Sequence, residues 1–335
     1  MSHIAVVGTG QIGSRHLQGL ARIDREIDIS VVDPSRSALE KARACFEEMP
    51  MNELIRSVSF FESLSLLGTD IDVAIIATNA NVRKEVVEDL LKQTRVSFMI
   101  LEKVAFQSVN DFQVVMKSLS ENNTRAWVNC TRRMFPLYKM IKRELCSEEK
   151  LLFHFESGNW GLASNSIHVI DLFAFLTEET KIILDISGLD RDVYNSGRDG
   201  FIEFGGILNV RTEKGSQMTL FDHKGTEGQF VIQIATRSRR YIIFEFYESR
   251  GMSRHLESKA IFFDDETGWK WNEKSFRIPY QSELTHFAVQ QILDSGTCDL
   301  ISITESFPLH RSMLEAFNEH LEEVDGTVYN RCPIT

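Results

Sequence analysis

Residues 8 to 13 read Gly-Thr-Gly-Gln-Ile-Gly and lie between the apolar run Ile4–Val7 and a helix-like stretch. In a G-x-G-x-x-G turn between a strand and a helix, the first glycine permits a tight turn. The second lets a pyrophosphate approach the backbone, and the third lets helix and strand pack closely. Free N–H groups at the helix start attract phosphate. The sequence therefore predicts a dinucleotide-binding turn whose cofactor contacts are Gly8, Gly10, Gln11, Ile12 and Gly13.

Asp33 lies twenty residues after Gly13, at the end of a second apolar run. A carboxylate at this point is expected to accept hydrogen bonds from the adenosine ribose hydroxyls. A 2′-phosphate about 5 Å away would be repelled by roughly 3 kcal/mol per charge at an effective dielectric of 20. That repulsion corresponds to about two orders of magnitude in affinity. We therefore expect NAD as the cofactor, with NADP disfavoured, and expect Arg36 to soften this preference without reversing it.

Composition limits the other partners. The net charge of −11 and the pI near 5.4 argue against nucleic acid, which needs clustered Lys and Arg. No apolar run approaches membrane-spanning length, and no secretory leader is recognisable, so we expect a cytoplasmic protein without membrane attachment. The five cysteines form no C-x-x-C pair, and the histidines show no helical H-x-x-x-H pair. We therefore expect neither a disulfide framework nor a catalytic metal.

The pattern of elements predicts two domains. Residues 1–128 alternate strand-like and helix-like segments, including the continuous apolar run Asp72–Ala77, which is typical of a strand buried on both faces. Such alternation predicts a doubly wound parallel sheet of the Rossmann type. Residues 129–335 begin and end with helices around strand-like runs between 181 and 272, several with period two. They predict an α+β domain with an open-faced, mostly antiparallel sheet flanked by helices.

Ligands of such a parallel sheet bind at the carboxyl ends of its strands. The residues at those ends are therefore expected to contact the cofactor: Ala77, Thr78, Asn79, Glu102, Lys103 and Asn129. Lys103 is also placed to exchange a proton with a substrate hydroxyl. The alternative for Lys103 is a lysine that only solvates the end of a strand.

A second group of polar residues lies on a predicted helix. Ser164, His168 and Asp171 are spaced one turn apart, so they share one face, whereas Ile167 and Val169 belong to the apolar remainder. His168 is a candidate acid or base at this position. The alternative is a histidine that only packs or hydrogen-bonds on the helix surface.

The order of these motifs resembles the Gfo/Idh/MocA oxidoreductase family, which includes glucose–fructose oxidoreductase and inositol dehydrogenase. The motifs that carry the resemblance are Gly8–His16, Ala77-Thr78, Glu102-Lys103, Asn129-x-x-Arg132-Arg133 and Gly161…His168-x-x-Asp171. The resemblance implies a Rossmann domain, an open-faced sheet that often serves as an oligomer interface, and NAD(P)-dependent hydride transfer on sugars, polyols or their activated derivatives. In that scheme Lys103 resembles the lysine of the family's E-K-P motif, and His168 resembles its acid/base histidine.

Four positions depart from the family pattern. Val104 stands where E-K-P has proline, and residues 78–83 replace the proline and histidine of T-P-N-x-x-H with Asn79 and Arg83. Ser164 stands where many members have aspartate, four residues before the histidine. A serine hydroxyl cannot accept a proton as a carboxylate does, and losing a positioned acid/base group typically costs ~10²–10⁴-fold in rate.

The first hypothesis is an NAD-dependent dehydrogenase or reductase acting on a carbinol or keto carbon of a sugar, polyol, sugar acid or nucleotide sugar. Lys103 and His168 would handle the proton, and the arginines would suit an anionic group on the substrate. The expected substrate-binding residues are Asn129, Arg132, Arg133, Asn159, Trp160 and Asn165. We also expect a homo-oligomer formed through the C-terminal sheet. The alternatives are a catalytically silent NAD-binding sensor or regulatory protein of the same fold, and a redox-neutral reaction with tightly held NAD.

Overall fold

The computed structural model describes residues 1–145, 149–246 and 257–335, and this part of the chain forms two compact units. The first unit comprises Met1–Thr131, Pro279–Thr304 and Thr335. The second comprises Arg132–Ile278 and Glu305–Ile334. None of the helices in these ranges is long and apolar enough to cross a membrane.

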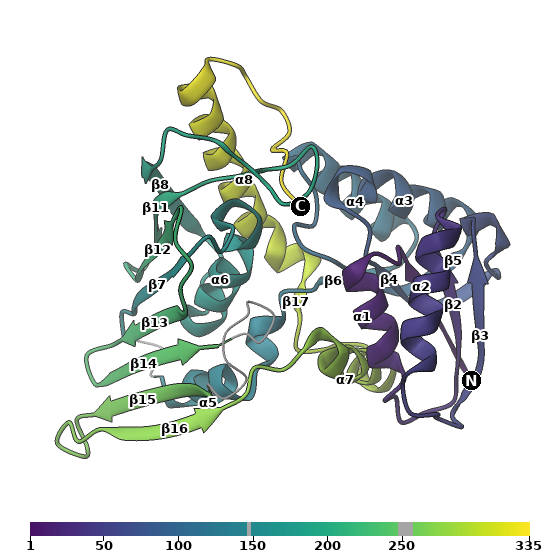
Figure 1. The fold of residues 1–335 in the computed structure, drawn as a ribbon, viewed down its shortest axis with the longest axis horizontal. Coiled ribbons are helices and arrows are strands. Elements are labelled where there is room, and N and C mark those ends of the chain that lie inside the picture. The colour runs from purple at the N-terminus through teal and green to yellow at the C-terminus, as the bar shows by residue number, and fades with distance from the viewer. Residues whose placement is uncertain (146–148, 247–256) are drawn as a thin grey trace. The chain divides into compact units, whose positions relative to one another are not determined.

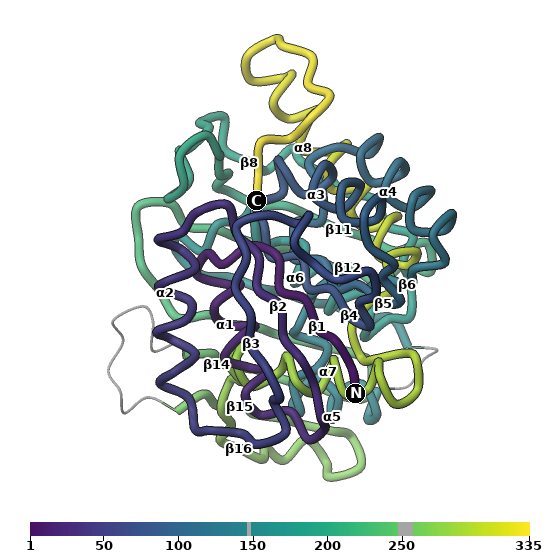
Figure 2. Tube along the Cα trace, turned by 90° about the vertical axis from the view of Figure 1, so that its right-hand side faces the viewer, coloured from purple at the N-terminus to yellow at the C-terminus, as the bar shows by residue number. Residues whose placement is uncertain are grey.

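A seven-stranded sheet forms the centre of the first unit, with the order β17-β6-β5-β4-β1-β2-β3. Neighbouring strands are parallel except for β17, which pairs antiparallel with β6. Figure 2 shows β3, β2, β1, β4 and β5 following one another across the view. The strands are β1 (Ser2–Val7), β2 (Ile27–Val32), β3 (Ile55–Phe61), β4 (Asp70–Ile76), β5 (Arg95–Leu101), β6 (Arg125–Val128) and β17 (Ile301–Ser302). Successive residues of β1 and β4 are buried, as expected of a parallel sheet covered on both faces.

Five α-helices accompany this sheet in the described part of the unit: α1 (Gln11–Leu20), α2 (Arg36–Glu47), α3 (Ala80–Gln93), α4 (Val109–Glu121) and α7 (Gln281–Ser295). The side chains of Ser35 and Ser108 cap α2 and α4 by accepting a backbone N–H each. Helix α7 packs against α1, where a Cβ on Gly19 would lie 2.7 Å from Cβ of Thr285. The two units therefore differ from the predicted domains 1–128 and 129–335, because α7 and β17 belong to the first unit although they come late in the sequence.

The second unit contains an eight-stranded sheet with the order β16-β15-β14-β13-β7-β12-β11-β8, whose strands follow one another from β8 at the top to β16 at the bottom of the left side of Figure 1. Its pairs are antiparallel except for the parallel pair β7–β12. The strands are β7 (Leu152–Gly158), β8 (Ile182–Leu189), β11 (Gly206–Thr212), β12 (Gln217–His223), β13 (Phe230–Ala235), β14 (Arg239–Glu245), β15 (Ser258–Asp264) and β16 (Asn272–Phe276). A separate two-stranded ribbon pairs β9 (Tyr194–Asn195) with β10 (Ile202–Glu203).

Helices α5 (Pro136–Glu144), α6 (Leu162–Thr177) and α8 (Ile303–Asp325) lie on one side of this sheet in Figure 1. Burial alternates along the strands. In β13, for example, Ile232 and Ile234 are buried, whereas Val231 and Gln233 are not. The opposite face stays open and carries exposed Leu152 and Ile183. The predicted fold class, a Rossmann sheet followed by a mostly antiparallel sheet with flanking helices, is confirmed.

Several element boundaries differ from those predicted. Residues 201–210, which form one strand-like run in the sequence, are divided into β10 and β11 by Phe204 and Gly205, and β11 begins at Gly206 with a φ of +87°. Strands β16 and β17 were not predicted, because Asn272–Phe276 is largely polar and Ile301–Ser302 is very short. The predicted strand Arg240–Tyr247 corresponds to β14, and Tyr247 lies outside the described residues.

Candidate functional site

The glycine turn joins β1 to α1, and its three glycines have different surroundings. Gly8 has φ +91°, and a Cβ there would lie 2.9 Å from the backbone nitrogen of Thr78. A Cβ on Gly13 would overlap the carbonyl oxygen of Gly8 at 1.9 Å. At Gly10, by contrast, a Cβ would meet no atom of the described residues within 4 Å. Two glycines therefore permit close packing, and Gly10 leaves open space at the start of α1.

Two unpaired polar groups belong to the glycine turn and to Thr78 beside Gly8. Helix α1 has no side-chain capping bond at Gly10, its N-cap. Within the described part of the chain, the hydroxyls of Thr9 and Thr78 are buried and have no hydrogen-bond partner. Buried hydroxyls normally find a partner, and free N–H groups at a helix start favour phosphate. These residues therefore fit the pyrophosphate and ribose of a dinucleotide.

Asp33 follows β2 and is fixed by the backbone on both sides. Its Oδ2 accepts a hydrogen bond from the N–H of Thr9 at 2.7 Å, and its Oδ1 accepts one from Ser35 at 2.8 Å. A carboxylate has lone pairs for further donors, so Asp33 remains able to accept from ribose hydroxyls. Arg36 is exposed and pairs with Glu40 at 3.3 Å, which directs its charge along α2.

Glu102, the residue before Lys103, is the centre of a buried polar network in the first unit. Its Oε1 lies 2.8 Å from Nε2 of His16 and also accepts a hydrogen bond from Nδ2 of Asn129. Burial raises the pKa of the Glu102 carboxyl, but the hydrogen bond and charge of His16, the Asn129 amide and the charge of Arg83 together lower it to about 2. Glu102 is therefore ionised at neutral pH, so His16 Nε2 donates to it.

The network continues onto α7. Nδ1 of His16 lies 3.0 Å from the Thr285 hydroxyl, and Asn129 donates to Oε1 of Gln281 at 2.9 Å. Gln281 in turn donates to the Thr285 hydroxyl at 3.1 Å. Glu102 and Asn129 thus have protein partners, and their predicted contact with the cofactor stays a prediction. Gln281 and Thr285 were missed because nothing in their local sequence links them to residues more than 150 positions away.

Arg83 holds the backbone on both sides of Lys103. Its buried guanidinium donates to the carbonyl oxygen of Glu102 at 2.6 Å and to that of Ala105 at 2.9 Å. It also donates to the carbonyls of Val104 and Thr78. The Lys103–Val104 peptide bond is cis. One side chain thus joins the ends of β4 and β5, where cofactor-binding residues were predicted.

Arg83 was noted in the sequence only as a departure from a family motif. A signal was nevertheless present, since Ala80, Arg83, Val87 and Leu90 form one buried stripe of α3. A charged residue in an apolar helix stripe is almost never fully buried unless it is paired. Arg83 is 1% exposed, and backbone carbonyls are its partners.

His168 lies on α6 in the second unit and is half-buried, as are Ser164 and Asn165. Asp171, one turn further, is fully buried and accepts two hydrogen bonds from Arg133, each of 2.9 Å. Burial raises the pKa of the Asp171 carboxyl to about 6, and the charge and hydrogen bond of Arg133 oppose the rise. Asp171 therefore serves as the partner of Arg133.

Arg132 is also engaged within its unit. Its Nη1 lies 2.8 Å from each carboxylate oxygen of buried Glu245, and Tyr138 donates to the same carboxylate at 2.5 Å. Both arginines predicted to contact substrate are thus bound to buried carboxylates that lie 113 and 38 positions away in the sequence.

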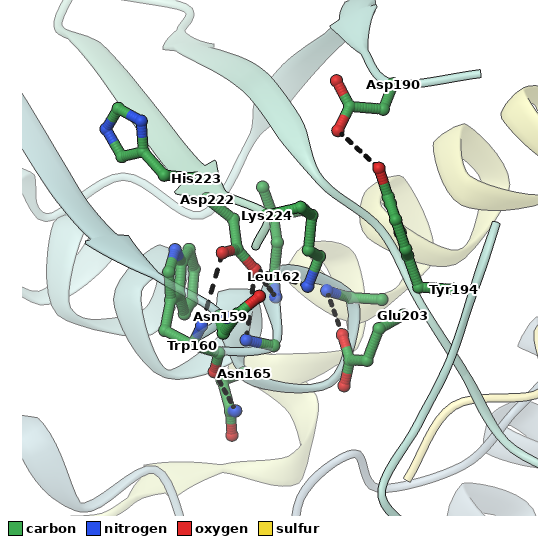
Figure 3. A network of polar contacts seen from close by, with 12 residues as sticks. Asn159, Trp160, Leu162, Asn165, Asp190, Tyr194, Glu203, Asp222, His223 and Lys224 are labelled. Atoms are coloured by element: carbon green, nitrogen blue, oxygen red, sulfur yellow. Dashed lines mark hydrogen bonds and ion pairs between the residues drawn. The ribbon is translucent and has the colours of Figure 1, made fainter. Parts of the chain in front are cut away.

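The three other predicted substrate residues shape the loop before α6 (Figure 3). Asn159 has φ +47° and bonds the β12–β13 loop through Thr226 O at 2.7 Å. Trp160 is buried, and its indole N–H donates to the Phe221 carbonyl at 2.9 Å. Asn165 donates to the Trp160 carbonyl at 2.8 Å. These contacts hold the loop, and a role in binding substrate stays a prediction for all three.

Two carboxylates that the sequence did not indicate cover the N-terminus of α6 (Figure 3). Asp222 accepts the N–H groups of Trp160, Gly161 and Leu162 at 3.2–3.3 Å, and Lys224 at 2.9 Å. Glu203 accepts the N–H groups of Ala163 at 2.9 Å and Ser164 at 3.3 Å, and the Ser164 hydroxyl donates to its other oxygen. Carboxylates from β12 and β10 thus take the place that an anion would occupy.

Residues 2–130 match the model of the GFO_IDH_MocA oxidoreductase family, an NAD-binding Rossmann fold. For residues 2–130, this match confirms the resemblance drawn from the motifs. No curated protein sequence matches the chain.

Solved structures extend the likeness to the second unit. An oxidoreductase from Agrobacterium radiobacter in complex with NAD+, L-tartaric acid and magnesium has a TM-score of 0.70 at 15% identity, covering 98% of both chains. A mutant of KijD10, a 3-ketoreductase from Actinomadura kijaniata, in complex with TDP-benzene and NADP, has a TM-score of 0.68 at 13% identity, covering 94% of this chain and 96% of the other.

The transcriptional regulator Gal80p from Kluyveromyces lactis has a TM-score of 0.70 at 13% identity, covering 96% of this chain and 92% of its own. At these identities the likeness establishes the fold over nearly the whole chain. Enzymes and a regulator share it, so the fold leaves the activity to be argued from the residues.

Proposed function

We propose that the protein is an NAD-dependent oxidoreductase that transfers hydride to or from a carbinol or keto carbon of a carbohydrate-type substrate. The observation that carries the proposal is the fixed backbone around Lys103, which Arg83 and the Glu102 network hold at the carboxyl end of β5. That end of a parallel sheet is where ligands of this fold bind. A fixed acid/base group serves proton transfer better than a mobile surface lysine.

The cofactor half of the proposal rests on the glycine turn. The open space at Gly10 and the buried hydroxyls of Thr9 and Thr78 fit a pyrophosphate and a ribose. Asp33 favours NAD over NADP, because its carboxylate would repel a 2′-phosphate. Bound NAD would accept or return the hydride. Lys103 and His168 would exchange the hydroxyl proton with the substrate as the carbon is oxidised or reduced.

The test is turnover with NAD over a panel of sugars, polyols and their derivatives. The panel is repeated with Lys103→Ala, His168→Ala and the double variant, with correct folding checked by thermal unfolding. We expect each single variant to lose at least about 100-fold in kcat. Substrate-dependent NADH formation that survives in the double variant would show the assignment to be wrong.

A regulatory NAD-binding protein is the second candidate, because the chain shares its fold with Gal80p and carries serine at position 164. Such a protein would bind NAD through the same turn without turning over any member of the panel. Turnover of a single sugar or polyol that depends on Lys103 would exclude this candidate.

We also propose a homo-oligomer formed through the open face of the eight-stranded sheet. Leu152 and Ile183 are more than half exposed on this face. Exposed apolar groups gathered on one face favour association. Light scattering coupled to size-exclusion chromatography should give a molecular mass that is a multiple of the 38.4 kDa chain mass. The variant Leu152→Arg should have a lower measured mass. A monomer at micromolar concentration would refute this proposal.

A further inference from the structure

The segment between β4 and α3 runs beside the glycine turn of the first unit. The N–H of Ala77 donates to the carbonyl oxygen of Val7 at 2.7 Å, and a Cβ on Gly8 would lie 2.9 Å from the backbone nitrogen of Thr78. Asn79 is the next residue, and it is exposed. Ligands of a parallel sheet bind at this end of its strands. Asn79 therefore lies at the edge where a dinucleotide bound by the glycine turn is expected.

Asn79 is also the N-cap residue of α3, but its side chain does not cap the helix. The first backbone N–H groups of an α-helix have no partner within the helix. An asparagine at the N-cap normally accepts one of them through its side-chain oxygen, and few residues are better suited to that role. The Asn79 side chain thus does not make the bond that its position in the helix favours.

Thr335 provides an acceptor for the start of α3 instead. The N–H of Ala80, the first residue of the helix, donates to the Thr335 hydroxyl oxygen at 2.9 Å, across 255 positions in the sequence. Ala80 is 4% exposed and Thr335 is 6% exposed. A backbone N–H buried to this extent is costly without an acceptor. The Thr335 hydroxyl therefore satisfies the start of α3 without using the Asn79 side chain.

Thr78 gives the same segment a second polar side chain that can serve a ligand. Its hydroxyl is buried and has no hydrogen-bond partner among the described residues. Buried hydroxyls normally have a partner. Thr78 and Asn79 together thus offer a hydroxyl and an amide at this edge of the sheet, and the bond from Ala80 to Thr335 holds the residue that follows them.

From this arrangement we propose that Thr335 is a positioning residue of the dinucleotide site. Its hydroxyl caps α3 in place of the Asn79 side chain, and the Asn79 amide is thereby left to bind a polar group of NAD. This inference rests on the binding of NAD in the proposed function and adds to it a residue far from the glycine turn in sequence. A side-chain amide both donates and accepts, so it suits the ribose hydroxyls of a dinucleotide.

The experiment measures the Kd for NAD by calorimetry in a double-mutant cycle of Thr335→Val and Asn79→Ala. Thr335→Val removes the acceptor and keeps the shape of the side chain, so the Asn79 side chain should turn to cap α3 and be lost to NAD. We expect each single variant to bind NAD about fivefold more weakly, the usual worth of one hydrogen bond. The double variant should bind no more weakly than Asn79→Ala, because both substitutions remove the same contact.

Two further variants control this cycle. Thr335→Ser keeps the hydroxyl and should bind NAD like the wild-type protein. Thr297→Val is the matched control, because Thr297 is an exposed residue of the same unit, and it should change nothing. Urea unfolding identifies any variant that does not fold. If Thr335→Val does not fold, Asn79→Ala decides: it should weaken NAD binding and leave the free energy of unfolding unchanged, although alanine at an N-cap normally destabilises a helix.

The outcomes separate this inference from the proposed function. Losses that multiply in the double variant, to about 25-fold, would show that Thr335 acts independently of Asn79 and would overturn the inference. Wild-type affinity in folded Thr335→Val, or lower stability without weaker binding in Asn79→Ala, would overturn it as well. The oxidoreductase assignment would survive each of these results, because its test is turnover that depends on Lys103 and His168. A wild-type protein that does not bind NAD would instead refute both.

Discussion

The guanidinium of Arg83 donates a hydrogen bond of 2.6 Å to the carbonyl oxygen of Glu102, whose own side chain binds His16. Arg83 of α3 thus holds the backbone of Glu102, and His16 of α1 binds its side chain. Lys103 is held by its neighbours on both sides in sequence, since Arg83 also binds the carbonyl of Val104. The proline absent from position 104 is therefore not needed to order this segment.

Arg83→Lys is expected to lower kcat at least tenfold and to reduce the free energy of unfolding by about 3 kcal/mol. A lysine keeps the charge, but it has three donors on one nitrogen and cannot span four carbonyls as a planar guanidinium does. The affinity for NAD should change by less than about threefold, since the four carbonyls to which Arg83 donates belong to residues 78, 102, 104 and 105, outside the glycine turn. Steady-state kinetics measures kcat, and urea unfolding measures the free energy of unfolding.

Exposed Arg36→Lys is the control for this substitution and should leave kcat and stability unchanged. Equal losses of kcat and NAD affinity in Arg83→Lys would contradict a specific effect on Lys103 and indicate general damage to the first unit.

Glu102 is expected to make stability depend on pH in the acid range. Its pKa is lowered from 4.5 in the unfolded chain to about 2 in the folded protein. The stabilisation is therefore fully present above pH 4.5 and is lost as the pH falls toward 2. The loss is on the order of 3 kcal/mol. Urea unfolding of the native protein and of Glu102→Gln is measured between pH 7 and 3. The difference between their free energies of unfolding should shrink as the pH falls.

If the difference in free energy of unfolding between these two proteins stays constant over the same pH range, Glu102 does not titrate in this range. Glu40→Gln is a suitable control, because Glu40 is exposed and pairs only at the surface with Arg36.

The glycine turn permits a paired test. Gly13→Ala should lower the free energy of unfolding by at least about 2 kcal/mol, because the new Cβ would overlap the Gly8 carbonyl. Gly10→Ala should fold with a change within about 1 kcal/mol, since its backbone conformation suits any residue and its Cβ meets open space. It should nevertheless bind NAD at least tenfold more weakly. Wild-type NAD affinity in Gly10→Ala would place the pyrophosphate elsewhere.

Asp33→Ser is expected to raise the affinity for NADP relative to NAD by about 100-fold. The substitution removes the charge that repels a 2′-phosphate and keeps a hydroxyl at the end of β2. Fluorescence titration with NADH and NADPH measures the ratio. If the wild-type protein already prefers NADPH, the expected role of Asp33 is refuted.

The sequence predicted most of the first unit, because its signals are local. The order of apolar runs and helices in residues 1–128, the glycine turn and the position of Asp33 each depend on a few consecutive residues. The elements of the second unit were also recognised, since period-two alternation marks strands such as β13 and β14. Boundaries were less accurate where strands are short or polar, as in β16 and β17.

By itself, the sequence determined the fold class, the family of residues 2–130 and the positions of Lys103 and His168 along their elements. Only the tertiary structure decided what surrounds them. Glu203, distant in sequence, brings a carboxylate to Ser164, Glu245 and Asp171 engage both arginines, and α7 joins the first unit. The physical reason is that periodicity and turn chemistry act between near neighbours. The partner of a buried charge depends instead on which distant strand ends beside it.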